Sequence, residues 1–180
     1  NMNVVHQFLL PSSPVSLFPC EYGRRYERVS RRALEGVKVV EVSNLISGPY
    51  CAKLMADLGA EVIKVEEPGL GDVARRREPF LDDIPGPERS GLFLYLNTNK
   101  LGVTLNLQVP TGRTIFRKLV EDADVLVENN PCHWLEGLHL DYDSLRKVNP
   151  RLIVTSITPF GQSGPYENYK AYNLNLYHIG

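Results

Sequence analysis

Five segments of the sequence combine backbone amide groups with small or polar side chains, which are the groups that hold a ligand in place. In chain order they are SNLISGPY (43–50), GDVARRR (71–77), LNTNK (96–100), VENN (127–130) and FGQSGPY (160–166). Each of them alone is typical of an ordinary turn. Their order and spacing along the chain are therefore the stronger signal for a binding site.

Motifs for covalent, metal or nucleotide chemistry are weak in this sequence. GLGDVA (69–74) is similar to the dinucleotide-binding fingerprint, but Pro79 soon ends any helix that could carry a pyrophosphate. A nicotinamide-dependent oxidoreductase is therefore the third and weakest alternative. Cys132 and His133 lack a second ligand pair, so no metal site is expected. Since the sequence contains neither G-x-S-x-G nor a Walker motif, these patterns leave the catalytic residues unknown.

Composition and charge indicate an ordinary globular protein. The chain has 180 residues, of which 43% are hydrophobic and 23% charged, and its net charge of −1 gives no general attraction for nucleic acid or anionic membranes. Its first twenty residues are interrupted by prolines and lack a basic leading region, so neither a signal sequence nor a membrane anchor is expected. Three cysteines without paired spacing indicate reduced thiols and a cytoplasmic protein.

Short apolar strands alternate with amphipathic helices between these segments. Residues 1–33 are expected to form an N-terminal extension or linker, and 34–180 to form the folded domain. The first strand, helix and strand occupy about 30 residues, which predicts parallel pairing with a right-handed crossover. The predicted strands are 37–43, 61–68, 124–129 and 151–157, the predicted helices are 47–60, 111–123 and 141–150, and 91–108 is predicted to be a pair of strands or a turn.

This alternation predicts an α/β fold with a Rossmann-like parallel sheet that is flanked by helices on both faces. In such sheets ligands bind beyond the carboxyl ends of the strands. The segments expected to contact a ligand are therefore 43–48, 66–71, 129–132 and 158–166.

The ordered segments resemble the class III CoA-transferase family, which includes formyl-CoA transferase, the carnitine and bile-acid inducible CoA-transferases and the α-methylacyl-CoA racemases. The resemblance implies the truncated N-terminal part of the family's large domain, in a homodimer or together with the remaining portion of the same protein. It runs from Leu34 to Gly180 and is carried by LEGVKVVEVSNLISGPYCAKLMADLGAEVIKVEEPGLGD, LNTNKLGVTLNL, TGRTIFRKLVEDADVLVEN, LRKVNPRLIVTSITPFGQSGPY and AYN.

The family's reaction implies what these segments would bind. An aspartate attacks an acyl-CoA thioester to give a mixed anhydride, the released CoA thiolate returns to form an aspartyl-CoA thioester, and an acceptor acid takes over the CoA. Fixed backbone amides suit the developing oxyanions. The resemblance thus implies acyl-CoA and a carboxylic acid as substrates, no tightly bound cofactor, and a nucleophilic aspartate beyond Gly180.

The family motifs also imply a set of CoA-binding residues. Residues 44–47 correspond to the segment laid against the pantetheine and acyl group, and Leu105 and Asn129 to positions near the adenosine and pantetheine. Arg75 is a candidate for the phosphates, although its charge run is more typical of a solvated surface. The complete set is Asn44, Leu45, Ile46, Ser47, Arg75, Leu105, Asn129, Lys170, Tyr172 and Asn173.

Several positions depart from the family pattern. Glu67 stands where many members carry arginine, Gln108 replaces a frequent lysine and Gly137 a common arginine, which is expected to weaken binding of the ADP part of CoA. Asn173 replaces a common carboxylate, and Tyr172 argues against the racemases, which carry a histidine there. The leading hypothesis is a CoA-transferase fragment that is inactive by itself. The alternative is a degenerate, non-catalytic scaffold or dimerisation domain, as in one half of a tandem protein.

Overall fold

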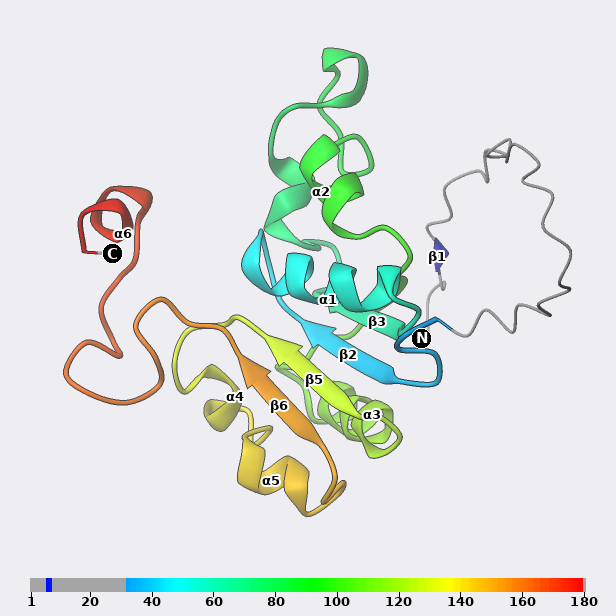
Figure 1. The fold of residues 1–180 in the computed structure, drawn as a ribbon, viewed down its shortest axis with the longest axis vertical. Coiled ribbons are helices and arrows are strands. Elements are labelled where there is room, and N and C mark those ends of the chain that lie inside the picture. Colours follow the sequence, from blue (N-terminus) through cyan, green and yellow to red (C-terminus); the bar gives the residue numbers. More distant parts are fainter. Residues whose placement is uncertain (1–5, 8–31, 180) are drawn as a thin grey trace, which may run out of the picture.

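A single mixed sheet forms the centre of the protein in a computed structural model that describes residues 6–7 and 32–179 (Figure 1). Its order is β1-β4-β3-β2-β5-β6, in which β2 to β6 are parallel and β1 pairs antiparallel with β4. The order changes direction at β2, which has β3 on one side and β5 on the other. The strands are β1 (His6–Gln7), β2 (Lys38–Val42), β3 (Glu61–Glu66), β4 (Leu101–Thr104), β5 (Val125–Glu128) and β6 (Ile153–Ser156).

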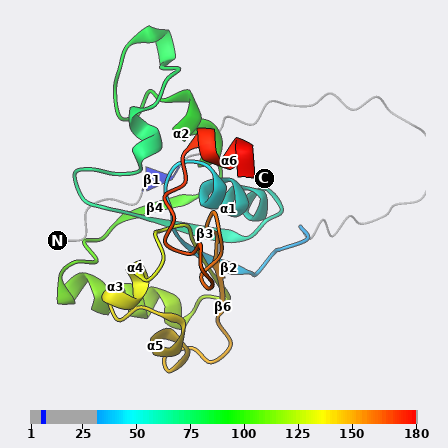
Figure 2. The same ribbon diagram turned by 90° about the vertical axis from the view of Figure 1, so that its left-hand side faces the viewer.

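Helices cover both faces of the sheet, and Figure 2 shows α1 on one side and α3 and α4 on the other. This arrangement confirms the predicted α/β fold. Helix α6 lies apart from the sheet, after the long segment that follows β6 (Figure 1). The helices are α1 (Ser47–Asp57), α2 (Gly91–Leu96), α3 (Pro110–Glu121), α4 (Trp134–Gly137), α5 (Tyr142–Arg146) and α6 (Asn173–Ile179), with short 3-10 turns η1 (Val73–Arg76) and η2 (Leu81–Asp83).

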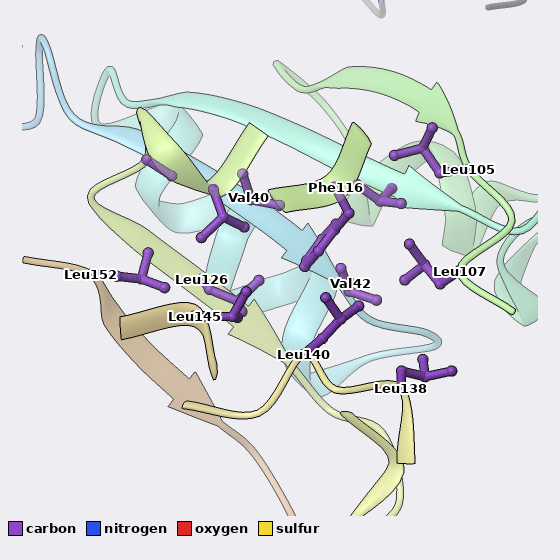
Figure 3. Close-up of a cluster of buried hydrophobic side chains, with 13 residues drawn as sticks. Val40, Val42, Leu105, Leu107, Phe116, Leu126, Leu138, Leu140, Leu145 and Leu152 are labelled. Atoms are coloured by element: carbon purple, nitrogen blue, oxygen red, sulfur yellow. The ribbon is translucent and has the colours of Figure 1, made fainter. Parts of the chain in front are cut away.

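The core has two layers because side chains alternate along each strand. Val39 of β2 packs with Ala52 and Ala56 of α1 on one face. Its neighbour Val40 points to the opposite face and packs in the larger cluster around Phe116 of α3 (Figure 3). Both faces of β2 are therefore buried, as expected for the central strand of a parallel sheet.

Most of the predicted elements are present with slightly shorter bounds, but the expectation of a strand at 91–100 is wrong. This segment contains α2, and only the following residues form a strand, β4. Ser90 Oγ accepts a hydrogen bond from Phe93 N at 3.2 Å and caps the helix. Phe93 and Leu96, three residues apart, are both buried. The helical spacing of these two side chains thus prevails over the alternating pattern GLFLYL.

The glycine-rich segment 69–74 does not lead into a crossover helix. The segment runs into η1, which begins at Val73 and has only four residues, and Arg77 after this turn is extended. The long dipole of a dinucleotide-binding helix is therefore missing at this position. Elsewhere, among the residues that the structure describes, no helix has the length and hydrophobicity needed to cross a membrane. The predicted extension 1–33 lies almost wholly outside the described residues.

Candidate functional site

The carboxyl ends of β2 and β5 meet where the strand order changes direction, and two asparagines join them there. Asn129 Oδ1 accepts a hydrogen bond from Asn44 N at 2.8 Å, and Asn129 Nδ2 donates to Asn44 O at 2.7 Å and to Ser47 Oγ at 3.1 Å. Ligands bind at this point in open α/β sheets. Three of the predicted CoA-binding residues, Asn44, Ser47 and Asn129, thus form one hydrogen-bonded cluster.

The turn between β2 and α1 has an unusual backbone. Leu45 has a φ of 64°, which side chains other than glycine, asparagine and aspartate rarely adopt. Its amide donates to Asp72 Oδ1 at 2.9 Å, which fixes this conformation. Ile46 is the N-cap residue of α1 and is 58% exposed. The turn therefore places the positive end of the α1 dipole and an exposed apolar side chain at the same edge of the sheet.

Gly48 allows α1 to pack closely on the end of β2. A Cβ atom at this position would lie 2.4 Å from Ser43 Cβ and 2.6 Å from Ser43 Oγ, and 3.3 Å from Asn129 Cγ. These distances are too short for any side chain. The close approach of the helix is what brings Ser47 within reach of Asn129.

A buried ionic network lies beneath this turn. Glu41 has no exposed surface, and its carboxylate oxygens lie 2.8 Å from Lys64 Nζ and 2.7 Å from Lys100 Nζ. Lys64 Nζ also lies 2.8 Å from Asp72 Oδ2. Ser43 Oγ donates to Glu41 at 2.6 Å. The two carboxylates and two ammonium groups balance in charge, which is the condition for burying them together.

The pKa values of the network follow from burial and charge pairing. Burial alone would raise the pKa of Glu41, but the two lysines outweigh it and hold this pKa below its ordinary value. For Lys100, burial outweighs the attraction of Glu41 and lowers the pKa to about 8. Burial also raises the pKa of the Cys51 thiol, on the first helix above the network. Of the two lysines in the network, Lys100 is therefore the one that titrates nearer to neutral pH, because pairing with Glu41 and Asp72 raises the pKa of Lys64 above its ordinary value.

We expect Lys100 to make stability rise with pH on the alkaline side. The unfolded chain keeps this proton up to a pKa of about 10.5, whereas the folded chain loses it near 8, so the unfolded state binds more protons between these values. Relative to Lys100→Met, the free energy of unfolding of the wild type should rise by up to about 1.4 kcal/mol per pH unit in this window. Urea unfolding of both proteins at several pH values measures this difference in the free energy of unfolding. A pH-independent difference would contradict the assignment.

A cavity of about 100 Å³ opens next to the asparagine cluster, between the ends of β2, β3 and β4. Leu105, one of the predicted residues, contributes to its wall and is 7% exposed. Glu67 and Gln108, two of the departures from the family pattern, also line it. Gly137, another departure, does not line this cavity, although Trp134 of the same helix, α4, does. The wall residues are Val42, Ser43, Asn44, Val65, Glu66, Glu67, Gly71, Leu105, Asn106, Leu107, Gln108, Asn130 and Trp134.

A larger, more open cavity of about 490 Å³ lies on the other side of Asn129. Lys170 and Tyr172 line it together with Asn129, so these predicted residues are also neighbours of the asparagine cluster. Cys132 Sγ lies in the same wall and contacts the carbonyl oxygens of Gly161 and Glu167 at 3.4 Å and 3.2 Å. The side chain of Asn173, at the start of α6, is outside the described part of the structure.

Arg75 is occupied by contacts that do not involve the asparagine cluster. Its guanidinium pairs with Glu66 at 2.8 Å and with Glu88 at 2.7 Å, and it lies 3.7 Å from the centre of the Phe93 ring. Burial lowers the pKa of Arg75, but these carboxylates outweigh it and raise the pKa above its ordinary value. A phosphate group would have to compete with both glutamates for this side chain.

The described residues contain no cluster of three or more histidine, cysteine, aspartate or glutamate side chains that could hold a metal ion. What sequence reasoning missed is the buried network of Glu41, Lys64, Asp72 and Lys100. One signal was available, because KVVEV and EVIKV each place a charge inside an apolar strand. The structure pairs these two strands so that Glu41 and Lys64 are register partners.

Comparison with known proteins shows what the chain is similar to. The chain is 40% identical over 142 residues to a succinate–glutarate CoA-transferase of Agrobacterium fabrum, covering 78% of this chain and 36% of that protein. It is 43% identical over 141 residues to a formyl-CoA:oxalate CoA-transferase of Rhodopseudomonas palustris, covering 78% of this chain and 32% of that protein. The chain thus spans about a third of the length of these relatives.

Solved structures give the same result. A CAIB/BAIF family protein from Brucella suis has a TM-score of 0.75 and 38% identity to this chain, covering 83% of this chain and 39% of that one. Residues 34–180 match the family model described as CoA-transferase family III. The resemblance found in the sequence is therefore confirmed, and the chain belongs to CoA-transferase family III.

Proposed function

We propose that this chain forms the CoA-binding edge of a CoA-transferase that moves CoA from an acyl-CoA thioester to a carboxylic acid. The observation that carries the proposal is the cluster of Asn44, Ser47 and Asn129 at the point where the strand order changes direction, flanked by two cavities. A pantetheine chain is narrow and carries two amide groups, so it suits the polar groups that these strand ends present. CoA thioesters are substrates here rather than a resident cofactor.

The reaction would proceed through an aspartyl intermediate. In this proposal the nucleophilic aspartate lies beyond Gly180, and residues 1–180 bind CoA without turnover. The contribution of the present chain is to orient the thioester against backbone amides at the start of α1 and in the 158–166 loop. We also propose that the whole protein acts in the cytoplasm as a homodimer, or pairs with the remaining portion of its own sequence. The two thiols of the described residues, Cys51 and Cys132, are free, which is compatible with a reducing compartment.

Isothermal titration of the 180-residue chain with CoA tests the proposal, with NAD as the comparison ligand. We expect heat of binding with CoA and none with NAD. If CoA gave neither heat nor a thermal shift at millimolar concentration, the proposed function would fall. The alternative, a non-catalytic scaffold, would then be favoured.

One observation favours that alternative and leads to a prediction. The wall of the cavity beside Leu105 consists wholly of residues that the structure describes. It contains glutamates but neither lysine nor arginine. Glu67 is exposed at its rim. CoA carries phosphate groups, so Glu67→Arg should replace electrostatic repulsion of these groups by attraction. We expect the dissociation constant for CoA to fall by about five- to tenfold at low salt, and added salt should reduce this difference.

Glu121→Arg is the matched control for this charge reversal. Glu121 is exposed at the last turn of α3, next to the opposite end of the sheet. The two variants have the same net charge, so a change seen only with Glu67→Arg reports a local effect. Equal affinities for the two variants would show that the CoA phosphates do not lie near this cavity.

A further inference from the structure

Side chains from other elements hold much of the backbone of the segment from Ser43 to Pro49 in place. Five of its backbone groups have such partners, none of which is supplied by a sheet ladder or by the turns of α1. They are Ser43 O with Lys64 at 3.0 Å, Asn44 N and Asn44 O with Asn129, Leu45 N with Asp72 at 2.9 Å, and Pro49 O with Lys100 at 2.8 Å.

Asp72 connects this segment to the buried network. Its Oδ1 accepts from Leu45 N at 2.9 Å and from Ala74 N at 2.8 Å, while its Oδ2 lies 2.8 Å from Lys64 Nζ. In return, Asn44 Oδ1 accepts from Val73 N at 3.3 Å. The turn after β2 and the turn after β3 therefore hold each other through a pair of side chains, one from each turn.

The burial of Asp72 and the strained backbone that it fixes favour a role beyond general stability. Asp72 is 1% exposed, and it is the partner that holds Leu45 at its positive φ. A strained backbone persists only where the surroundings fix it, and such positions occur mostly where a ligand is held. Without Asp72, the Leu45 amide would lose its acceptor and Leu45 could relax toward a negative φ, which would displace Asn44 and Ser47.

We propose that Asp72, itself held by Lys64, is a positioning residue that keeps residues 43–49 in the shape that receives the pantetheine chain. This inference rests on the proposed function for the identity of the ligand. It differs from that proposal because Asp72 lies beneath the segment and does not line either of the two cavities that flank the asparagine cluster.

The test compares Asp72→Ala with Asp72→Asn and with the control Asp141→Ala in the 180-residue chain. Asp141 caps α5 by accepting from Ser144 N at 3.1 Å, so its loss also removes an aspartate cap but at a distance from the segment. The readouts are the CoA dissociation constant by calorimetry, the hydrogen exchange of residues 43–50, and the melting temperature. The melting temperature reports general destabilisation, which both alanine variants should show.

We expect Asp72→Ala to weaken CoA binding about tenfold and to accelerate exchange of the Leu45 amide by a similar factor. Asp72→Asn keeps an oxygen that can accept from Leu45 N and Ala74 N, but it sets an amide NH2 against Lys64 Nζ, so it should melt below the wild type and yet bind CoA more tightly than Asp72→Ala does. Asp141→Ala should change neither readout in this segment. The proposal is overturned if Asp72→Ala affects CoA affinity no more than Asp141→Ala does.

Two further outcomes are distinguishable. If Asp72→Ala does not fold, the double variant Lys64→Met with Asp72→Ala removes the same acceptor for the Leu45 amide and leaves no unpaired ammonium group of Lys64. The CoA dissociation constant and the hydrogen exchange of this double variant then test the proposal. If the wild type itself does not bind CoA, the proposed function fails. The hydrogen exchange of the Leu45 amide still tests whether Asp72 fixes the conformation of residues 43–49. Unchanged exchange in Asp72→Ala would then overturn the inference, and faster exchange restricted to 43–50 would support its structural step.

Discussion

Glu41→Gln is expected to lower the melting temperature by about 10 °C. The Glu41 carboxylate is fully buried and pairs with the ammonium groups of both Lys64 and Lys100. A glutamine side chain carries no charge, so below the pKa of Lys100 the network would hold two ammonium groups and one carboxylate, that of Asp72, and relieving this excess would require Lys100 to give up its proton. Leaving a buried charge without its partner costs about 3–5 kcal/mol, a large fraction of the stability of a domain.

Two comparisons make this first prediction specific. The double variant Glu41→Gln with Lys100→Met removes one charge of each sign and should recover at least half of the lost stability, since Lys64 and Asp72 remain paired. Glu121→Gln, at an exposed position, should melt within about 2 °C of the wild type. Thermal unfolding followed by circular dichroism measures all of these. A melting temperature of Glu41→Gln near that of the wild type would mean that the network does not carry the charges described here.

Gly48→Ala is expected to abolish measurable CoA binding and to cost about 1–3 kcal/mol of stability. The new Cβ would overlap Ser43, so α1 would have to move away from the end of β2. That movement would separate Ser47 from Asn129, which now lie in hydrogen-bond contact. Calorimetry with CoA and thermal unfolding measure the two effects.

Gly137→Ala is the matched control for this substitution. Gly137 lies in α4, and a Cβ there would have no neighbour within 4 Å. Alanine favours a helix over glycine by up to about 1 kcal/mol, so this variant should be equally or more stable and should bind CoA normally. Wild-type affinity in Gly48→Ala would argue that the start of α1 takes no part in binding.

The sheet and the meeting of the strand ends that form the candidate site could be predicted because their signals are local. The apolar run KVVEV, the helical spacing after Ser47 and the second run EVIKV follow one another closely, which requires parallel pairing. Once the strands are parallel, their carboxyl ends must share an edge. Asn44 and Asn129 are therefore brought together by topology alone, without any motif that links them.

Helix α2, the buried ionic network and the contacts of Arg75 depend on tertiary contacts and could not be predicted from the sequence. In GLFLYL the apolar residues fit a strand and a helix about equally, and the Ser90 cap and the burial of Phe93 and Leu96 decide for the helix. Glu41 and Lys64 look like solvent-facing positions of their strands until the sheet is covered on both faces and the register pairs them. Likewise, nothing near Arg75 in the sequence shows that Glu88, thirteen residues away, engages its guanidinium.

The contact between Asn44 and Asn129 joins residues 85 positions apart. Closing so long a loop costs entropy that a well-packed intervening chain offsets, here the helices α1, α2 and α3 and the strands β3, β4 and β5. The cluster of Asn44, Ser47 and Asn129 accordingly forms only when the sheet is assembled, and a transient opening of either half of the sheet would separate these residues. On the proposed function, CoA affinity is therefore expected to report on the assembly of the whole sheet.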